Sequence, residues 1–479
     1  MSDGRSEVVV IGGGITGLTA AYRLAHAARL RGIQLGITVV EAEDRLGGKI
    51  KSSSFAGLEG IDEGPDAYLA RVPHAVALTH DLGLDSRVTH PVSGHAAIMQ
   101  GGLQRIPEGL LLGVPTELGR LVRSPLLSWR GKGRAALEPF VPTSPDPQDS
   151  IGVFIRQRFG AEVLERLVDP LVGSIYAADT MNFSLEMVPQ LAALTSGRSV
   201  LMAARRSMKS APAPTRPVFD TPIDGMGSLI LALHRELINL GVEICTSTTV
   251  AAIDTDRTIS GAPLYRVSLS GASTEELRAR AVIVTSPANP SAHLFSKVDT
   301  SVADLLKTWN HASVVMVTLR TVETNLETFT GLSGYLVPKP NQNRVTAVSF
   351  GSNKWAHWKP TDGSMILRVS MGRDGAPADD LINTWDDERL VQQVLDEVAC
   401  HTGVSITAAD HRVTRWPHSF PQYRPGHAKV VDKLEKSLLV NAPGILFAGA
   451  SIRGIGIPAC VSQANQAAEV TLRRLTGVL

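Results

Sequence analysis

Residues 8–17 read VVVIGGGITG, an apolar run that ends in a glycine-rich turn. Such a run predicts a buried parallel strand, and the residues after the turn predict the start of a helix. Its glycines fit the G-x-G-x-x-G pattern, which permits a tight turn, close approach of a pyrophosphate and close packing of helix on strand. The helix start also offers free N–H groups to phosphates. The pattern predicts a dinucleotide site, with an ordinary turn as the alternative, at Gly12, Gly13, Gly14, Ile15, Thr16 and Gly17.

A second apolar strand supports this interpretation. Residues 37–40 lead into Glu41, which lies 24 residues after Gly17, and Ala42 follows. An acid at this distance is placed to bond a ribose hydroxyl. We therefore expect the second strand to lie beside the first, with Glu41 at its carboxyl end.

The next segment, RLGGK at residues 45–49, follows the second strand directly. The glycines Gly47 and Gly48 allow close backbone approach, and the cation of Lys49 can neutralise pyrophosphate charge. The alternative is a plain loop with surface charges. A further segment, DEGPD at residues 62–66, comes shortly after it.

The bulk composition excludes some classes of function. The chain has 479 residues, so two or three domains are expected. A net charge of +1 gives no strong field, and we expect no nucleic-acid partner. The N-terminus lacks the features of a signal peptide, and no run reaches transmembrane length. The three cysteines are far apart, so we expect no metal site and a reducing, cytoplasmic location.

Three kinds of region alternate along the chain. Residues 1–90, 218–299 and 412–479 carry strand–helix patterns and predict a discontinuous dinucleotide-binding domain of Rossmann type. Residues 91–217 predict an inserted helical domain, which either packs on itself or presents a basic amphipathic face to a membrane. Residues 300–411 predict a mixed-sheet substrate-binding domain. The expected fold class is therefore α/β.

The C-terminal region repeats the opening pattern. Residues 445–450 read as a buried strand, and a helix is expected from Ile457 onward. Between them lies a second glycine-containing helix start, Gly454, Ile455 and Gly456. Its N–H groups can stabilise negative charge on a ligand. A purely structural helix cap is the alternative.

These motifs resemble those of the glutathione-reductase-like FAD proteins, in the branch of the amine oxidases and protoporphyrinogen oxidases. Within this branch, the chain resembles the bacterial coproporphyrinogen III oxidases. The similarity rests on the segments above and on three further ones: DPLVGSIYAAD at 169–179, RWPHSFPQYRPGH at 415–427 and GASIRGIGIPACVSQ at 449–463. Together they span nearly the whole chain.

The resemblance implies FAD as cofactor and a set of residues that contact it. In this fold the second helix start points at the pyrimidine end of the flavin. Trp416 is expected to contact the cofactor, and the alternative is that it is an aromatic residue of the core. The implied contacts are residues 12–17 with Glu41, Ala42, Gly47, Gly48, Lys49, Gly64, Pro65, Asp66, Val250, Trp416, Gly454, Ile455, Gly456 and Ile457.

The resemblance also implies the reaction. The family oxidises coproporphyrinogen III to coproporphyrin III in haem biosynthesis, removing six electrons in three flavin turnovers with O2 as acceptor and H2O2 as product. The flavin carries this chemistry, so no catalytic side chain is predicted. Expected partners are the porphyrinogen and O2. Peripheral membrane contact and a transient handover of product to a ferrochelatase are further expectations.

The substrate's propionates require cations, and the arginine fork suits carboxylates. Arg71 is the first candidate, with a solvated surface arginine as the alternative. Lys354, Arg344 and Arg453 are weaker candidates. Tyr176 is expected to line the ring pocket, and packing in a helical core is its alternative.

Three other functions stay open. The first is a protoporphyrinogen IX oxidase, whose substrate has two propionates instead of four. The second is another amine oxidase-like flavoenzyme, which the PQY and DPLVGSIY segments disfavour. The third is a prenyl-GTPase escort protein, which binds partners without flavin chemistry. The second helix start at 454–457 favours a bound flavin over this last class.

Overall fold

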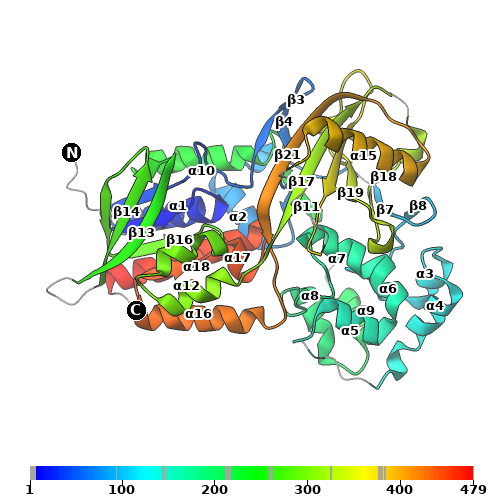
Figure 1. Ribbon diagram of the computed structural model, residues 1–479, viewed down its shortest axis with the longest axis horizontal. Helices are drawn as coiled ribbons and strands as arrows, with labels where there is room; N and C mark the ends of the chain where they lie inside the picture. Colours follow the sequence, from blue (N-terminus) through cyan, green and yellow to red (C-terminus); the bar gives the residue numbers. More distant parts are fainter. Residues whose placement is uncertain are drawn as a thin grey trace.

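The computed structural model describes residues 7–92, 94–142, 146, 148–210, 217–257, 263–323, 326–375, 381 and 384–477. Figure 1 shows three regions. A parallel sheet with its helices lies on the left, a larger sheet lies at upper right, and a group of helices lies below that sheet. The long strand β21 (Ala408–Pro421) runs between the left and right halves.

The parallel sheet has five strands in the order β12-β2-β1-β16-β22. All neighbouring pairs are parallel, and Val8 to Ile11 of β1 lie between β2 and β16 in unbroken register. This order places β1 at the centre, where both faces are covered. The strands are β1 (Val8–Ile11), β2 (Ile37–Val40), β12 (Glu243–Cys245), β16 (Ala281–Val284) and β22 (Ile445–Phe447).

Alternate residues of β1 face opposite layers. Val8 and Val10 pack with the helices α1 (Ile15–Leu30), α10 (Gly227–Asn239) and α18 (Ile457–Thr476). Val9 and Ile11 pack with the other layer. That layer contains α12 (Thr300–Lys307), α16 (His427–Asn441) and the antiparallel strands β13 (Thr248–Arg257), β14 (Pro263–Gly271) and β15 (Glu276–Ala279). A continuous apolar strand such as β1 forms because both of its faces are buried.

The second large sheet has seven strands in the order β21-β17-β20-β19-β18-β7-β8. Every neighbouring pair is antiparallel except β18 and β7, so the sheet is mixed as expected. Helix α15 (Asp387–Thr402) packs on one face through Leu390, Val394 and Val398. The other strands are β7 (His95–Met99), β8 (Leu103–Arg105), β17 (His311–Thr321), β18 (Leu332–Leu336), β19 (Val345–Phe350) and β20 (Ile366–Met371).

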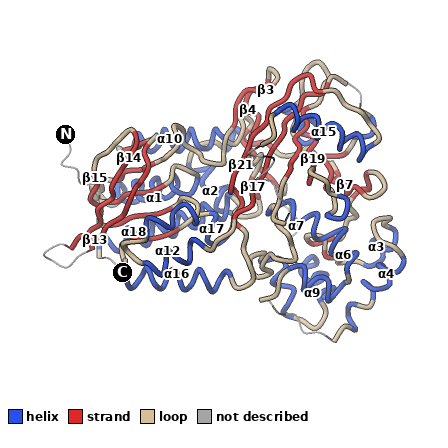
Figure 2. The backbone as a smooth tube through the Cα atoms, in the orientation of Figure 1, coloured by secondary structure: helices blue, strands red, loops and turns tan. Residues whose placement is uncertain are grey.

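The helical region shares one apolar core that contains Phe154, Phe159 and Phe183. Figure 2 shows its helices gathered below the strands of the mixed sheet. Among the described residues, no helix combines the length and apolarity needed to cross a bilayer. The main helices are α3 (Leu118–Arg123), α4 (Trp129–Ala136), α5 (Ile151–Phe159), α7 (Asp169–Tyr176) and α9 (Val200–Ser210).

The strand pairing differs from the predicted domain boundaries at two places. Strands β7 and β8 lie within residues 91–217, the predicted helical insertion, yet they extend the mixed sheet. Strand β21 crosses the predicted boundary at residue 412 and pairs along its length with β17. Both pairings join segments far apart in the sequence, and such long-range partners leave no trace in local hydrophobic periodicity.

Candidate cofactor site

The nucleotide loop (residues 12–17) joins β1 to α1 at the carboxyl edge of the parallel sheet. Gly12 has φ +108°, a conformation that L side chains rarely adopt. A Cβ on Gly17 would lie 1.9 Å from the carbonyl oxygen of Gly12. The loop therefore closes so tightly that helix and strand could not pack with a side chain at residue 17.

Gly14 is different because it faces open space. It is the N-cap of α1, has ordinary backbone angles, and a Cβ there would meet no atom within 4 Å. Within the described part of the chain, no side chain caps this helix start. The N–H groups of the first turn are thus presented to an open region, which is the cradle that a pyrophosphate requires.

The carboxylate of Glu41 lies against this loop. Its Oε2 accepts a hydrogen bond from the Gly13 N–H at 2.5 Å, and its Oε1 accepts one from the Glu43 N–H at 2.8 Å. These bonds fix the carboxylate at the end of β2 and leave lone pairs for a ligand hydroxyl. The geometry is compatible with the predicted ribose contact, and the neighbouring Ala42 is exposed.

The RGG loop (residues 45–49) is tied to the nucleotide loop. The Gly47 N–H donates to the Gly13 carbonyl at 2.8 Å, and Gly47 and Gly48 both have positive φ. A Cβ on Gly48 would lie 3.5 Å from Gly14 Cα. Close approach of two backbones is therefore the reason for glycine here.

Lys49, the last residue of the RGG loop, is a cation without a neighbouring carboxylate in the described ranges to balance its charge. Among the described residues it has no ion-pair partner, and burial lowers the pKa of its ammonium group. A cation that is desolvated and unpaired is unfavourable on its own. An anionic ligand beside the nucleotide loop would relieve this cost, so Lys49 fits a pyrophosphate group.

The GPD loop (residues 64–66) packs against the RGG loop, because a Cβ on Gly64 would lie 2.1 Å from the Lys49 carbonyl oxygen. The carboxylate of Asp66 accepts hydrogen bonds from Lys354 Nζ at 2.8 Å and Trp355 Nε1 at 3.0 Å. The charges of Lys354 and Arg368 hold the pKa of Asp66 far below its usual range although burial acts the other way. Its side chain therefore binds the mixed-sheet domain and leaves the backbone for a cofactor contact.

Trp416 and Val250, two further predicted cofactor contacts, lie beside different loops of the site. The indole N–H of Trp416 donates to the Glu63 carbonyl at 3.1 Å, which sets its ring against Gly64. Val250 is buried at a β-bulge in β13, and Thr248 of the same strand donates to the Glu41 carbonyl. Trp416 therefore lies beside the GPD loop, and the strand of Val250 lies beside Glu41.

The second helix start (residues 454–457) leads into α18, whose N-cap Gly456 is exposed and has no side-chain cap from any described residue. Gly454 has φ +127°. Burial raises the pKa of the nearby Cys460 thiol, which fits a neutral packed residue. Two uncapped helix starts, those of α1 and α18, thus border the same site, and both favour negative charge.

One residue near the second helix start was not predicted from the sequence. His311 at the start of β17 places Nε2 3.4 Å from the Ser451 hydroxyl. Burial, with Lys49 and His418 as smaller causes, lowers the pKa of His311 to about 4. The ring is neutral at ordinary pH, and no local motif in the sequence marks it.

Tyr176 lies at the end of α7 and belongs to a row of rings. Its ring centroid is 4.8 Å from that of Phe183, which is 5.5 Å from that of Tyr423. The Tyr423 hydroxyl donates to the carbonyl of Ala450, just before the second helix start. Phe183 and Tyr423 are fully buried, so Tyr176 is the partly exposed member of an aromatic cluster that joins the core of the helical region to the segment before the second helix start.

The predicted cations have different surroundings. Arg71 is exposed. Lys354 is bound to Asp66, and Arg453 pairs with Asp432 and Glu435 at 2.8 Å each. Arg344 lies over the Trp385 ring at 5.5 Å. Lys354 and Arg453 are thus neutralised by protein carboxylates.

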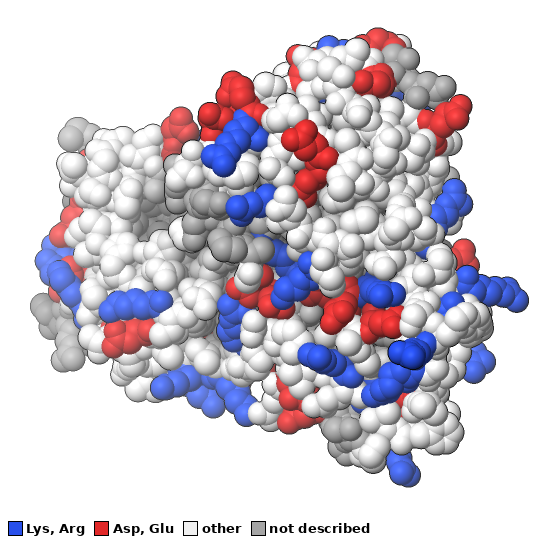
Figure 3. All heavy atoms as spheres, turned by 45° about the vertical axis from the view of Figure 1, so that its right-hand side comes forward, with Lys and Arg blue, Asp and Glu red and all other residues white. Residues whose placement is uncertain are grey.

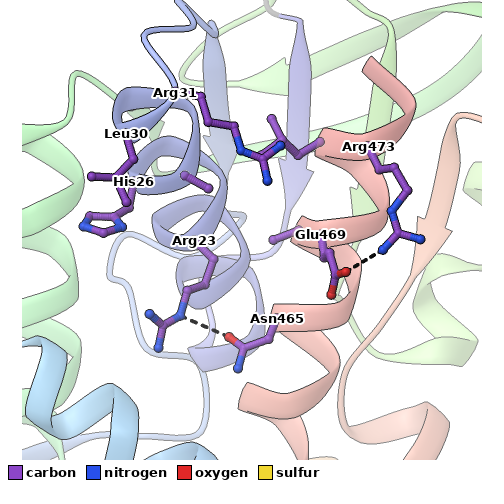
Figure 4. A pocket seen from close by; sticks show the side chains of 10 residues that line it. Arg23, His26, Leu30, Arg31, Asn465, Glu469 and Arg473 are labelled. Atoms are coloured by element: carbon purple, nitrogen blue, oxygen red, sulfur yellow. Dashed lines mark hydrogen bonds and ion pairs between the residues drawn. The ribbon is translucent and has the colours of Figure 1, made fainter. Parts of the chain in front are cut away.

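A pocket of about 490 Å³ lies elsewhere, between the second halves of α1 and α18. Figure 4 shows Arg23, Arg31 and Arg473 around it. Arg23 donates to Asn465 and Arg473 pairs with Glu469. Because the cofactor residues lie at the other ends of these two helices, this pocket is separate from the site.

Comparison with known proteins identifies the family. The sequence model of the family of flavin-containing amine oxidoreductases matches residues 15–472. The chain belongs to this family. It is an FAD-dependent oxidoreductase, as the motifs predicted, and the residues around the nucleotide loop fit that cofactor.

Within this flavin family, the chain is 31% identical to the coproporphyrinogen III oxidase of Bacillus subtilis, covering 99% of this chain and all of that protein. It is 26% identical to protoporphyrinogen oxidase 2 of Arabidopsis thaliana over 98% of this chain and 94% of the other. A solved structure from Exiguobacterium, described as a protoporphyrinogen oxidase, superposes with a TM-score of 0.84 at 29% identity, covering 99% and 100% of the two chains. These relatives confirm the predicted fold class and family.

Proposed function

We propose that the chain oxidises coproporphyrinogen III to coproporphyrin III, passing electrons from FAD to O2 with release of H2O2. The observation that carries the proposal is the pair of uncapped helix starts, those of α1 and α18, with the desolvated Lys49, an arrangement that suits a bound flavin nucleotide. Tyr176, the partly exposed member of the aromatic cluster, offers a ring face to a flat macrocycle. When bound, FAD accepts the electron pairs that the porphyrinogen releases.

The chain's own residues hold and orient the reactants in this proposal. Lys49 and the N–H groups of α1 bind the pyrophosphate, and Glu41 binds the ribose. The start of α18 stabilises negative charge that builds up at the pyrimidine end during reduction. Tyr176 and Arg71 are proposed substrate contacts. The greater identity to a coproporphyrinogen III oxidase than to a protoporphyrinogen oxidase favours the substrate with four propionates.

Steady-state turnover tests the substrate. Flavin-loaded protein in air is given coproporphyrinogen III or protoporphyrinogen IX, and porphyrin fluorescence, O2 uptake and H2O2 are followed. We expect a higher kcat/KM for coproporphyrinogen III and equal amounts of O2 consumed and H2O2 formed. A preference for protoporphyrinogen IX would instead identify the enzyme as a protoporphyrinogen IX oxidase. No turnover of either substrate refutes both.

We further propose a peripheral contact of the helical region with an anionic membrane. Trp129 is 75% exposed, Leu137 57% and Phe140 81%. Residues 118–136 contain five Lys or Arg and no Asp or Glu, and Figure 3 shows cationic side chains over the lower right of one face. Exposed aromatics with cations suit an anionic interface. Flotation with anionic vesicles, lost in neutral ones and in Trp129→Ser, is the expected result; no flotation refutes the contact.

A cytoplasmic location and a transient handover of the porphyrin to a ferrochelatase complete the proposal. The handover is tested by mixing the flavin-loaded enzyme with a ferrochelatase and following metal insertion. Faster insertion than from free porphyrin at the same concentration is expected. Equal rates would refute direct transfer.

A further inference from the structure

Two large apolar side chains lie side by side on the surface near the GPD loop. Leu69 of β5 (Tyr68–Leu69) is directly opposite Phe219 of β11 (Phe219–Pro222) in an antiparallel pair. Opposite residues of such a pair project from the same face. Leu69 is 37% exposed and Phe219 38% exposed.

The next pair on these strands is reversed in burial. Tyr68 and Asp220 are opposite each other and only 3% and 5% exposed. The strand pair therefore buries a tyrosine and an acid and turns its apolar face to solvent, contrary to the usual alternation. Leu69 and Phe219 thus offer two exposed apolar side chains on one face of the strand pair, a small contact surface for an apolar ligand.

A cation borders this face. Arg71 lies in the turn after β5, which is held by hydrogen bonds from Ala70 N–H to the Val218 carbonyl at 3.0 Å and from Val72 N–H to the Leu69 carbonyl at 3.4 Å. Arg71 is exposed and has no ion-pair partner among the described residues. A free guanidinium beside apolar side chains suits a ligand that is apolar with a carboxylate at its rim.

The same face lies next to the cofactor site. Lys354 Nζ is 2.8 Å from the Asp66 carboxylate and 5.8 Å from the centre of the Phe219 ring. Asp66 belongs to the GPD loop, so a single side chain separates Phe219 from that loop. A ligand on the face can therefore extend toward the cofactor.

We propose that Leu69, Phe219 and Arg71 form a ledge that binds one propionate-bearing rim of a tetrapyrrole. The apolar ring edge lies on Leu69 and Phe219, and the carboxylate pairs with the Arg71 guanidinium. This inference rests on the proposed function and names the part of the chain that recognises the substrate's rim.

Substitution of Arg71 tests the ledge. Arg71→Gln removes the cation, and we expect KM for coproporphyrinogen III and Kd for the product coproporphyrin III to rise roughly tenfold, with kcat nearly unchanged. Product binding is measured by quenching of porphyrin fluorescence, independently of turnover. Arg71→Lys keeps the charge and is expected to recover part of the affinity. Arg31→Gln removes an exposed arginine at the far end of α1 and is the matched control.

A second variant tests the apolar part. Phe219→Ser is expected to weaken product binding while flavin content and thermal unfolding stay at their wild-type values, since the side chain is on the surface. Wild-type turnover with KM and Kd within twofold in Arg71→Gln and Phe219→Ser would refute the ledge and leave the proposed function intact. Wild-type protein that neither oxidises nor binds a tetrapyrrole would refute the proposed function itself.

Discussion

Arg373 and Asp169 form a buried two-point contact, with Nη1 3.0 Å from Oδ2 and Nη2 2.9 Å from Oδ1. Asp169 also accepts a hydrogen bond from the Thr180 hydroxyl at 2.6 Å. Arg373 follows β20 and Asp169 begins α7. The pair therefore joins the helical region to the mixed sheet and fixes the helix that ends at Tyr176.

Replacing Arg373 with Gln should destabilise the protein by about 3–5 kcal/mol, because the Asp169 carboxylate stays buried without its partner. Urea unfolding of flavin-loaded protein measures the change. Arg473→Gln is the control, since Arg473 pairs with Glu469 on the surface; its loss should be below about 1 kcal/mol. Equal losses in the two variants would contradict the role given to the buried pair.

Gly14→Val and Gly17→Ala should separate cofactor binding from folding. A Cβ at Gly14 would meet none of the described atoms within 4 Å, and the side chain would extend into the space in front of α1. We expect Gly14→Val to fold with wild-type stability and to bind FAD at least about tenfold more weakly. Gly17→Ala should lose both, because its Cβ clashes with the Gly12 carbonyl.

Flavin content after purification and thermal unfolding of the flavin-free protein measure these two effects. Gly14→Val protein that retains wild-type FAD affinity would show that the pyrophosphate does not lie at the nucleotide loop.

Lys49→Met should change stability and cofactor affinity in opposite directions. The lysine is an uncompensated cation without FAD, so its removal should leave the flavin-free protein as stable or more stable. FAD binding should weaken roughly tenfold because a charge-assisted contact is lost. Calorimetric titration with FAD checks the second effect. Unchanged affinity would place the anion elsewhere.

Asp62 should make stability depend on pH. Burial raises the pKa of this carboxyl to about 7, and Oδ2 has no hydrogen-bond partner among the residues that the structure describes. The folded protein therefore binds a proton that the unfolded chain releases at its ordinary pKa near 4. Stability from this group is full below about pH 4 and falls as pH rises to about 7.

Asp62→Asn is neutral at every pH and should remove this decline. The difference in unfolding free energy between wild type and Asp62→Asn, measured from pH 4 to pH 8, isolates the single group. We expect the variant to gain roughly 1–4 kcal/mol relative to wild type across that interval. A difference that does not vary with pH would show that Asp62 is ionised throughout.

Local patterns predicted several of the elements. The strand at 37–40 and the helix beginning at Ile457 lie where the sequence predicted them, since each segment buries apolar side chains. Pairing partners were not predictable in the same way. Strand β7 lies beside β18, and their contact depends on the whole chain between them.

At the cofactor site too, local patterns did not predict contacts with residues far along the chain. The glycine pattern predicted the nucleotide loop because backbone geometry alone requires it. Asp66 was predicted as a cofactor contact, yet its carboxylate is held by Lys354 and Trp355, which lie far along the sequence. The motif identified the loop, whereas the partner of the side chain is set by domain packing.

Anaerobic reduction of the flavin tests the central claim most directly. Flavin-loaded protein is mixed with coproporphyrinogen III in the absence of O2, and the visible absorbance of the flavin and the fluorescence of the porphyrin are followed together. The account predicts rapid bleaching of the flavin as porphyrin appears, and return of the flavin spectrum with H2O2 when air is admitted. A flavin that stays oxidised in the presence of both coproporphyrinogen III and protoporphyrinogen IX would contradict it.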